Sequence, residues 1–347
     1  MFNRTTFDAQ RLKDRTLKHN YWRNDMRSAF WILSMVVVAF GLAPVAHAKK
    51  DAGHSKDYRT FHSDGQIEYG KISDSYTADL VMYLAGNQFM VMEELIKDFQ
   101  SKNTDIKTVY VETIPPGQIL KGQILKQGII DGQKTAQNPD LFASVNLGHL
   151  KRLKAKGIMD DYMIYIHNKL ELMIAAGNPK GIKGPNDLAR DDLNQSHPNP
   201  LTEGIFKFYG SQMLKDMGLH EKVTGGAQCK SCWAVKDKTW FTSRHHRETP
   251  QRIEDGIADV GIVWTTEVVH AKAEGRKIDG VAIPAPLNQQ DRVGYAIGAL
   301  KTGRNQEHAK RYLAHLATDG AQAIYAKYGF VPATAEELKL KPIPDSK

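Results

Sequence analysis

Apolar and polar positions follow two different rhythms along most of this chain. Short apolar runs, "ADLVMYLAG" at 78–86 and "IKTVYVETI" at 106–114, predict buried strands. Between them, residues 87–102 place apolar side chains at helical spacing, with Asn87 in position to cap the helix. Because strands that alternate with helices are typical of parallel sheets, the pattern predicts an α/β fold with mostly parallel sheets flanked by helices.

The same alternation continues to the end of the chain. Further strands are predicted at 139–146, 169–175 and 258–264, and a long helical pattern at 306–329. Ligands of such sheets bind beyond the carboxyl ends of the strands. We therefore expect binding residues in the polar turns that follow the first three strands, and these turns contain Asn87, Gly117 and Asn146.

The N-terminal region reads as a targeting segment rather than as part of the fold. Residues 29–48 are apolar, broken by glycine and proline, and end in Ala-His-Ala, which is typical of a cleavable secretory signal. Residues 1–25 form an unusually long polar leader, and Met26 would itself start a signal of ordinary length, so Met26 is a candidate true start. An extended leader and an uncleaved membrane anchor are the alternatives. We expect export to the periplasm, followed by a polar extension at 49–77 that is mobile or draped over the surface.

Composition changes this picture little. The chain has 347 residues, is 41% hydrophobic and carries a formal charge of +8. Residues 1–48 hold seven of its 47 Lys and Arg and three of its 39 Asp and Glu, so the remainder carries +4. That charge is too small to predict nucleic-acid binding.

The order of segments between residues 78 and 335 resembles the type 2 periplasmic solute-binding proteins of ABC importers, in particular their molybdate and tungstate branch. The resemblance is carried by "AGNQFMVMEELIKDF", "NPDLFASVN", "NKLELMIAAGNPKGIKGPNDLAR", "GIADVGIVWTTEV" and the segment from "YAIGALK" to "YGFVP". It implies two α/β lobes with a ligand in the cleft between them. Lobe one would span 78–164 and 292–335, lobe two 165–291, and 336–347 would be a tail.

Carried over residue by residue, the resemblance implies a set of cleft residues. Asn87 takes the place of a hydroxyl that holds the oxyanion, and Trp264, followed by Thr265, takes the place of a tyrosine. Glu203 lies near a turn that offers a backbone donor, where a carboxylate would repel an oxyanion by about 1 to 4 kcal/mol. The expected ligand is therefore a small anion, without commitment to molybdate.

The stretch "QCKSCWAVKDKTWFTSRHHRETP" at 228–250 contains both cysteines of the chain, Cys229 and Cys232. Their spacing to His245 matches the first three ligands of a zinc module, but the fourth ligand is missing. In an exported protein a disulfide between the two cysteines is the simplest prediction, and a redox pair is the alternative.

The second half of this stretch is a charged turn, which the resemblance places at the cleft. Its candidate ligand residues are Arg244, His246, Glu248 and Thr249. Arginines there would suit an anion. His245 and His246 with Glu203 and Glu248 would suit a transition metal, and the sequence does not choose between the two chemistries.

Together these observations predict a monomeric, non-enzymatic binding component of an ABC importer. Its partners would be a small solute and a permease in the inner membrane, with no cofactor and no nucleic acid. No nucleophile motif, phosphate loop or metalloprotease motif occurs in the sequence. A periplasmic metal-handling or redox protein, or a ligand-sensing subunit, remains as the alternative.

Overall fold

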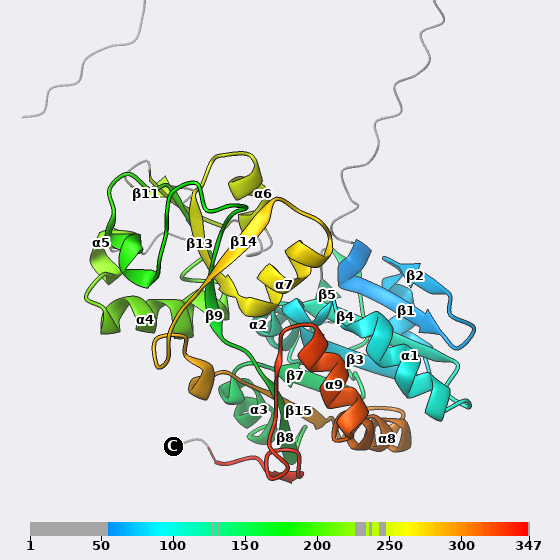
Figure 1. Ribbon diagram of the computed structural model, residues 1–347. Helices are drawn as coiled ribbons and strands as arrows, with labels where there is room; N and C mark the ends of the chain where they lie inside the picture. Colours follow the sequence, from blue (N-terminus) through cyan, green and yellow to red (C-terminus); the bar gives the residue numbers. More distant parts are fainter. Residues whose placement is uncertain are drawn as a thin grey trace, which may run out of the picture. The chain divides into compact units, whose positions relative to one another are not determined.

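The structure of the chain is a computed structural model that describes residues 55–126, 128–130, 132–225, 234–235, 238–242 and 248–345. All of them belong to one compact unit, Lys49–Lys347. Within these ranges no helix combines the length and the apolar character that a membrane crossing requires. The described residues form an α/β fold with two lobes, each built around its own sheet (Figure 1).

The sheet of lobe one has the strand order β16-β8-β15-β7-β3-β4-β1-β2, with β17 beside β8. Its strands are β1 (Tyr58–His62), β2 (Ile67–Tyr69), β3 (Leu80–Ala85), β4 (Thr108–Ile114), β7 (Leu141–Ser144), β8 (Asp161–His167), β15 (Gly294–Ala299), β16 (Val331–Pro332) and β17 (Lys341–Pro342). Strand β3 pairs in parallel with β4 and β7. The pairs toward both edges are antiparallel.

The sheet of lobe two has the order β11-β12-β10-β13-β9-β14. Its strands are β9 (Leu170–Ala175), β10 (Gln195–His197), β11 (Ala234–Val235), β12 (Thr239–Phe241), β13 (Val260–Trp264) and β14 (Ile278–Ala282). Strand β10 is parallel to β12 and β13, whereas β9 is antiparallel to both of its neighbours. A separate hairpin joins β5 (Ile129–Ile130) and β6 (Gln133–Lys134).

The α/β class and the two lobes are therefore confirmed, but the prediction of mostly parallel sheets is wrong. An apolar run shows that a strand is buried and carries no information on its direction. The chain crosses between the lobes at 168–169 and again over 283–293. Strand β8 leaves lobe one and β15 returns to it, so the two run in opposite directions and pair antiparallel.

Helices flank both sheets (Figure 1). Those of lobe one are α1 (Met92–Lys102), α2 (Pro116–Gln118), α3 (Leu147–Lys154), α8 (Gln306–Leu316) and α9 (Asp319–Lys327), with the π-helix η4 (Ile119–Ile124) and the 3₁₀ turns η1 (Ser55–Asp57), η2 (Ile72–Tyr76) and η3 (Gly86–Gln88). Those of lobe two are α4 (Ser211–Asp216), α5 (His220–Thr224), α6 (Glu248–Glu254) and α7 (Thr265–Ala273), with the π-helix η6 (Ile205–Gly210) and the 3₁₀ turn η5 (Pro185–Ala189). The 3₁₀ turn η7 (Gln290–Arg292) lies on the second crossing.

The N-terminal segment differs from the extension that the sequence predicts. Strand β1 pairs antiparallel with β4 along its whole length, and its residues Tyr58 and Phe61 are buried. The buried guanidinium of Arg59 donates to the carbonyl of Phe89 at 2.7 Å, and the Thr60 hydroxyl donates to Asp74 at 2.8 Å. Because the polar side chains find partners inside the fold, a strand forms where the sequence pattern shows no apolar run.

The predicted C-terminal tail also packs against the fold. Strand β17 pairs with β8, and Ile343, directly after it, is fully buried. Lys154 of α3 donates to the carbonyl of Ile343 at 2.6 Å. The chain up to Ile343 therefore belongs to the sheet of lobe one.

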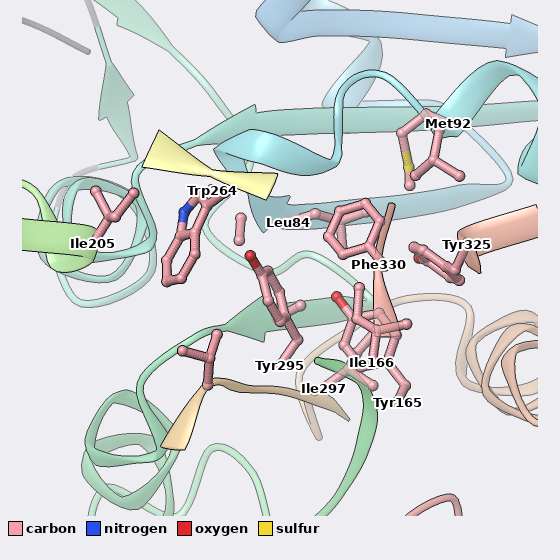
Figure 2. Packing of buried hydrophobic residues seen from close by; sticks show 14 of the residues in the cluster. Leu84, Met92, Tyr165, Ile166, Ile205, Trp264, Tyr295, Ile297, Tyr325 and Phe330 are labelled. Atoms are coloured by element: carbon pink, nitrogen blue, oxygen red, sulfur yellow. The ribbon is translucent and has the colours of Figure 1, made fainter. Parts of the chain in front are cut away.

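A buried aromatic cluster lies where the chain crosses between the lobes (Figure 2). Tyr165 packs edge-on against Tyr295 and Tyr325, with ring centroids 6.4 and 5.9 Å apart. Phe330 contacts Tyr295 at 5.7 Å in the same way. Figure 2 shows the hydroxyl end of Tyr295 on the side of its ring toward Trp264 of lobe two. Such pairs stabilise a core by about 0.5–1.5 kcal/mol each. The cluster therefore stabilises the end of lobe one at which the chain crosses to lobe two.

Candidate functional site

A cavity of about 150 Å³ opens between the two lobes, beyond the carboxyl ends of β3, β4, β7 and β13. It is smaller than the ~300–1,000 Å³ of pockets for drug-sized ligands, which favours a small ligand. Its lining consists of Ala85, Gly86, Asn87, Pro115, Pro116, Gly117, Lys121, Val145, Asn146, His149, Leu201, Thr202, Glu203, Gly204, Ile205, Lys207, Phe208 and Trp264.

Helix N-termini converge on this cavity from both lobes. In lobe one, α3 and the helix that α2 begins and η4 continues start at or directly after lining residues, and in lobe two α7 and the helix formed by η6 and α4 do so. The first amide N–H groups of a helix have no partner within the helix, and the helix dipole places partial positive charge there. Several such ends facing one small space make it suited to an anion.

Asn87 lines the cavity and is almost fully buried. Its Nδ2 donates to the Tyr295 hydroxyl at 2.5 Å. The Nδ2 of Asn168, on the crossing between lobes, lies 3.4 Å from the same hydroxyl and donates to Thr266 of lobe two at 3.1 Å. Asn87 therefore joins a network that spans both lobes and does not cap α1, which begins at Met92.

Tyr209 makes a second link between the lobes beside the cavity. Its hydroxyl, on η6 of lobe two, donates to the carbonyl of Val145 in lobe one at 2.8 Å. Its ring packs on Trp264 with centroids 5.5 Å apart. Trp264 is buried and ends β13, so the sheet of lobe two places its ring in the cavity lining, with the Tyr209 ring of η6 packed against it.

Glu203 lines the cavity, but its carboxylate is bonded within lobe two. It accepts hydrogen bonds from the backbone N–H of Asn199 at 3.1 Å and from the Thr242 hydroxyl. Its negative charge also favours the charged form of Arg252, whose pKa burial lowers. Glu203 thus holds the turn that begins η6, which reduces the repulsion that the sequence predicts for an anion.

Three basic residues line the cavity that the sequence analysis did not select. Lys121 and Lys207 are exposed at its edge, on opposite lobes, and His149 is half-buried on α3. Lys121 is the third residue of η4, which continues α2, and Lys207 is the third residue of η6. A basic residue one turn into a helix that starts at the cavity is the signal that would have identified them.

The charge around His149 is positive. The pKa of His149 is lowered to about 4, mainly by burial. Lys121, Arg152 and Lys207 lower it as well through their positive charge. The same three positive charges favour an anion in the cavity beside His149.

Asn146 caps α3 and lines the cavity. Its Oδ1 accepts the backbone N–H of Gly148 at 2.9 Å, so the carbonyl end of the side chain serves the helix. Gly117, on the short helix α2, faces the ring of His149 across the cavity wall. Together with Asn87, Glu203 and Trp264, these are the sequence-predicted residues in the lining.

The other predicted ligand residues within the described ranges do not line the cavity. Glu248 forms an ion pair with Arg252 at 3.0 Å in the first turn of α6. Thr249 is fully buried, 3.1 Å from the Ser196 hydroxyl. Thr265 begins α7, and its backbone N–H donates to the carbonyl of Lys169 at 3.0 Å. These contacts of the three residues thus lie within lobe two or the crossing next to it.

The remaining candidates, Cys229, Cys232, Arg244, His245 and His246, lie outside the described residues. The alternative metal site would need these histidines. Among the residues that the structure describes, no group of three or more His, Cys, Asp or Glu is placed to hold a metal ion.

Comparison with known proteins places the fold among binding proteins. The sequence profile of the family described as bacterial extracellular solute-binding protein matches residues 80–331. The chain is 27% identical to a sulfate-binding protein of Synechococcus elongatus over 178 residues, 50% of this chain and 49% of that protein. It is 26% identical to the thiosulfate-binding protein of Escherichia coli over 184 residues, 50% of this chain and 54% of that protein. The chain thus spans about half the length of these relatives.

A solved structure shows the same fold. The periplasmic molybdate-binding protein of Azotobacter vinelandii aligns with 74% of this chain and 100% of its own, with a TM-score of 0.55 and 18% identity. The alignment supports the two-lobed arrangement described above.

Proposed function

Because this chain belongs to the bacterial extracellular solute-binding protein family, we propose that it binds a small anion in the cavity between its lobes and delivers it to the permease of an ABC importer. The observation that carries this proposal is the convergence of helix N-termini from both lobes on one small cavity, flanked by Lys121, Lys207 and His149. The names of the sulfate- and thiosulfate-binding relatives support the same ligand class. In this function the protein is a carrier and not an enzyme.

Binding between lobes also suggests how the ligand controls the protein. A ligand that contacts both lobes stabilises their closed arrangement by the difference between its affinities for the closed and open forms. Lys121 and Lys207 come from opposite lobes, so an anion held by both connects them. The closed form would be the one that the permease recognises.

The proposal extends to the location of the protein. We propose a monomer that is exported by a cleavable signal within residues 1–48, with Cys229 and Cys232 joined in a disulfide. The N-terminal sequence of the protein recovered from the periplasm tests cleavage, and titration of its thiols tests the disulfide.

A thermal-shift series tests anion binding directly. Mature protein, unfolded and refolded to remove any carried ligand, is heated with sulfate, thiosulfate or molybdate, and with divalent metals for comparison. An anion at ~100 times its dissociation constant is expected to add about 2.7 kcal/mol to the free energy of unfolding and to raise the melting temperature. Stabilisation by a metal and by none of the anions would contradict the proposal.

The hydrogen bond of Tyr209 is expected to contribute to closure. Tyr209→Phe removes its hydroxyl, and with it the bond to the Val145 carbonyl of the other lobe, while the ring contact with Trp264 stays. Loss of about 1 kcal/mol from the closed form should weaken anion binding about fivefold. Isothermal titration calorimetry measures this, with Tyr69→Phe, at a tyrosine that is 50% exposed on β2, as the matched control. Equal affinities of Tyr209→Phe and wild type would show that the bond does not act in closure.

A further inference from the structure

The ring of His149 is oriented across the cavity wall. Its Nδ1 lies 2.8 Å from the Ser144 hydroxyl oxygen, behind the cavity. The opposite edge of the ring faces Gly117, because a Cβ added at Gly117 would lie 3.8 Å from Cε1 and 3.9 Å from Nε2. Gly117 and His149 both line the cavity. Nε2, for which the described residues provide no hydrogen-bond partner, therefore lies beside Gly117 in the wall of the cavity.

The contacts of Ser144 decide which ring nitrogen carries the hydrogen. Ser144 is fully buried, and its hydroxyl oxygen accepts the backbone N–H of Asn146 at 3.0 Å. Within the described part of the chain, its other side-chain contact is Nδ1 of His149. A buried hydroxyl hydrogen needs an acceptor, and neutral Nδ1 is one. Ser144 thus donates to Nδ1, which leaves the hydrogen of the neutral ring on Nε2.

Burial, and after it three nearby positive charges, lower the pKa of His149 and keep the ring neutral before a ligand binds. The charges are Lys121 on η4, Arg152 on the same helix as His149, and Lys207 on η6 of lobe two. The carboxylate of the cavity lining, Glu203, is bonded to Asn199 and Thr242. With the pKa of His149 at about 4, the ring is a neutral donor at neutral pH.

We propose that His149 contacts the bound anion directly, donating its Nε2–H to a ligand oxygen, and that Ser144 is a positioning residue that fixes this tautomer. The inference rests on the proposed function and adds the recognition of the ligand: the oxygen facing His149 must be a hydrogen-bond acceptor, which suits a fully deprotonated oxyanion. It also couples the site to protons. A bound anion favours the imidazolium form, so His149 takes up a proton more readily in the complex than in the free protein.

Affinity measurements with sulfate separate this inference from the function on which it rests. His149→Leu removes the donor and is expected to weaken sulfate binding about tenfold or more, whereas His149→Gln keeps a side-chain N–H and should bind within about threefold of wild type. If wild type binds sulfate and His149→Leu binds it equally well, the inference is overturned and the function stands. If wild type binds none of sulfate, thiosulfate and molybdate, the function fails and the inference with it.

The pH dependence provides a readout that a merely structural histidine would not change. Wild type is expected to bind sulfate more tightly as the pH falls from 7 toward about 4, which is the pKa of His149 in the free protein. The reason is that the complex takes up a proton that the free protein does not hold. Sulfate remains a dianion in this range, so the change belongs to the protein. His149→Gln should give a flat profile. A flat profile in wild type, or an identical slope in His149→Gln, would overturn the proton coupling.

The tautomer is measured by ¹⁵N NMR of the full-length protein labelled at histidine. At pH 7 the His149 signals should show a hydrogen on Nε2 and an unprotonated Nδ1, and Ser144→Ala should shift them toward the other tautomer. A hydrogen on Nδ1 in wild type, or an unchanged pattern in Ser144→Ala, would overturn the role of Ser144. Ser144→Ala and the two His149 variants are compared with wild type by circular dichroism, so that a folding defect is recognised.

Discussion

Exchanging Lys121 and Lys207 together for glutamate is expected to weaken anion binding about a thousandfold. The Coulomb energy of two unit charges ~4 Å apart in water is about 1 kcal/mol, so reversing one lysine changes the interaction by about 2 kcal/mol. Two reversals give about 4 kcal/mol, or roughly three powers of ten in the dissociation constant. Both lysines are exposed, so the fold should tolerate the change. Calorimetric titration at low and high salt measures the effect.

A second pair of lysines controls for net charge. Lys310 and Lys339 are 71% and 69% exposed and do not line the cavity. The double variant Lys310→Glu and Lys339→Glu changes the total charge by the same amount and should retain the affinity of wild type. Because exposed charges are screened over about 10 Å at 0.1 M salt, the difference between the two double variants should shrink as salt is added. Equal losses in both would mean that the long-range charge of the protein, and not the cavity, attracts the anion.

Replacing Trp264 by alanine is expected to destabilise the protein by about 3–5 kcal/mol, the range for large buried aromatic residues. Trp264 is 2% exposed, packs on Tyr209 and forms part of the core cluster that continues across the crossing between lobes. A typical protein is stable by only about 5–15 kcal/mol, so this variant should unfold at a much lower urea concentration. Ligand binding should also weaken, since the cavity loses part of its wall.

Trp240 offers the matched control in the same sheet. It lies on β12 and is half-buried, so Trp240→Ala should cost less than Trp264→Ala. Trp264→Phe should recover much of the lost stability, because a ring remains against Tyr209. If Trp240→Ala were as destabilising as Trp264→Ala, Trp264 would contribute no more to the free energy of unfolding than a half-buried tryptophan of the same sheet, and the prediction would be wrong.

Local sequence pattern was sufficient for the main alternation of strands and helices between β3 and α9. The run at 78–86 became β3 and the periodic segment after it contains α1, because burial of an apolar strand or helix face depends on neighbouring residues along the chain. The sequence also predicted ligand contacts in the polar turns after β3, β4 and β7, and Asn87, Gly117 and Asn146 of these turns lie in the cavity lining. Glycine and proline mark the ends of the strands in the sequence. Ligands of α/β sheets bind beyond the carboxyl ends of the strands, so the turns at these ends are the expected site.

Strand direction and pairing could not be read in the same way. The segment 58–62 has buried arginine and threonine side chains, and it becomes a strand because β4, about 50 residues later, lies beside it. The long-range hydrogen bonds of Arg59 to Phe89 and of Thr60 to Asp74 leave no mark in the local pattern. For the same reason, the sheets turned out mixed and not mostly parallel.

The sequence by itself therefore determined the α/β class, the main alternation of strands and helices and the turns that carry the candidate site, since each depends on the local spacing of apolar residues. Only the tertiary structure decided which polar side chains meet. Asn87 and Tyr295 are 208 residues apart and share a hydrogen bond, and Lys121 and Lys207 reach one cavity from different lobes. On an isolated helix, His149 and these lysines look like solvated polar residues. They come together at one cavity, each near the N-terminal end of its helix, because distant parts of the chain pack against each other.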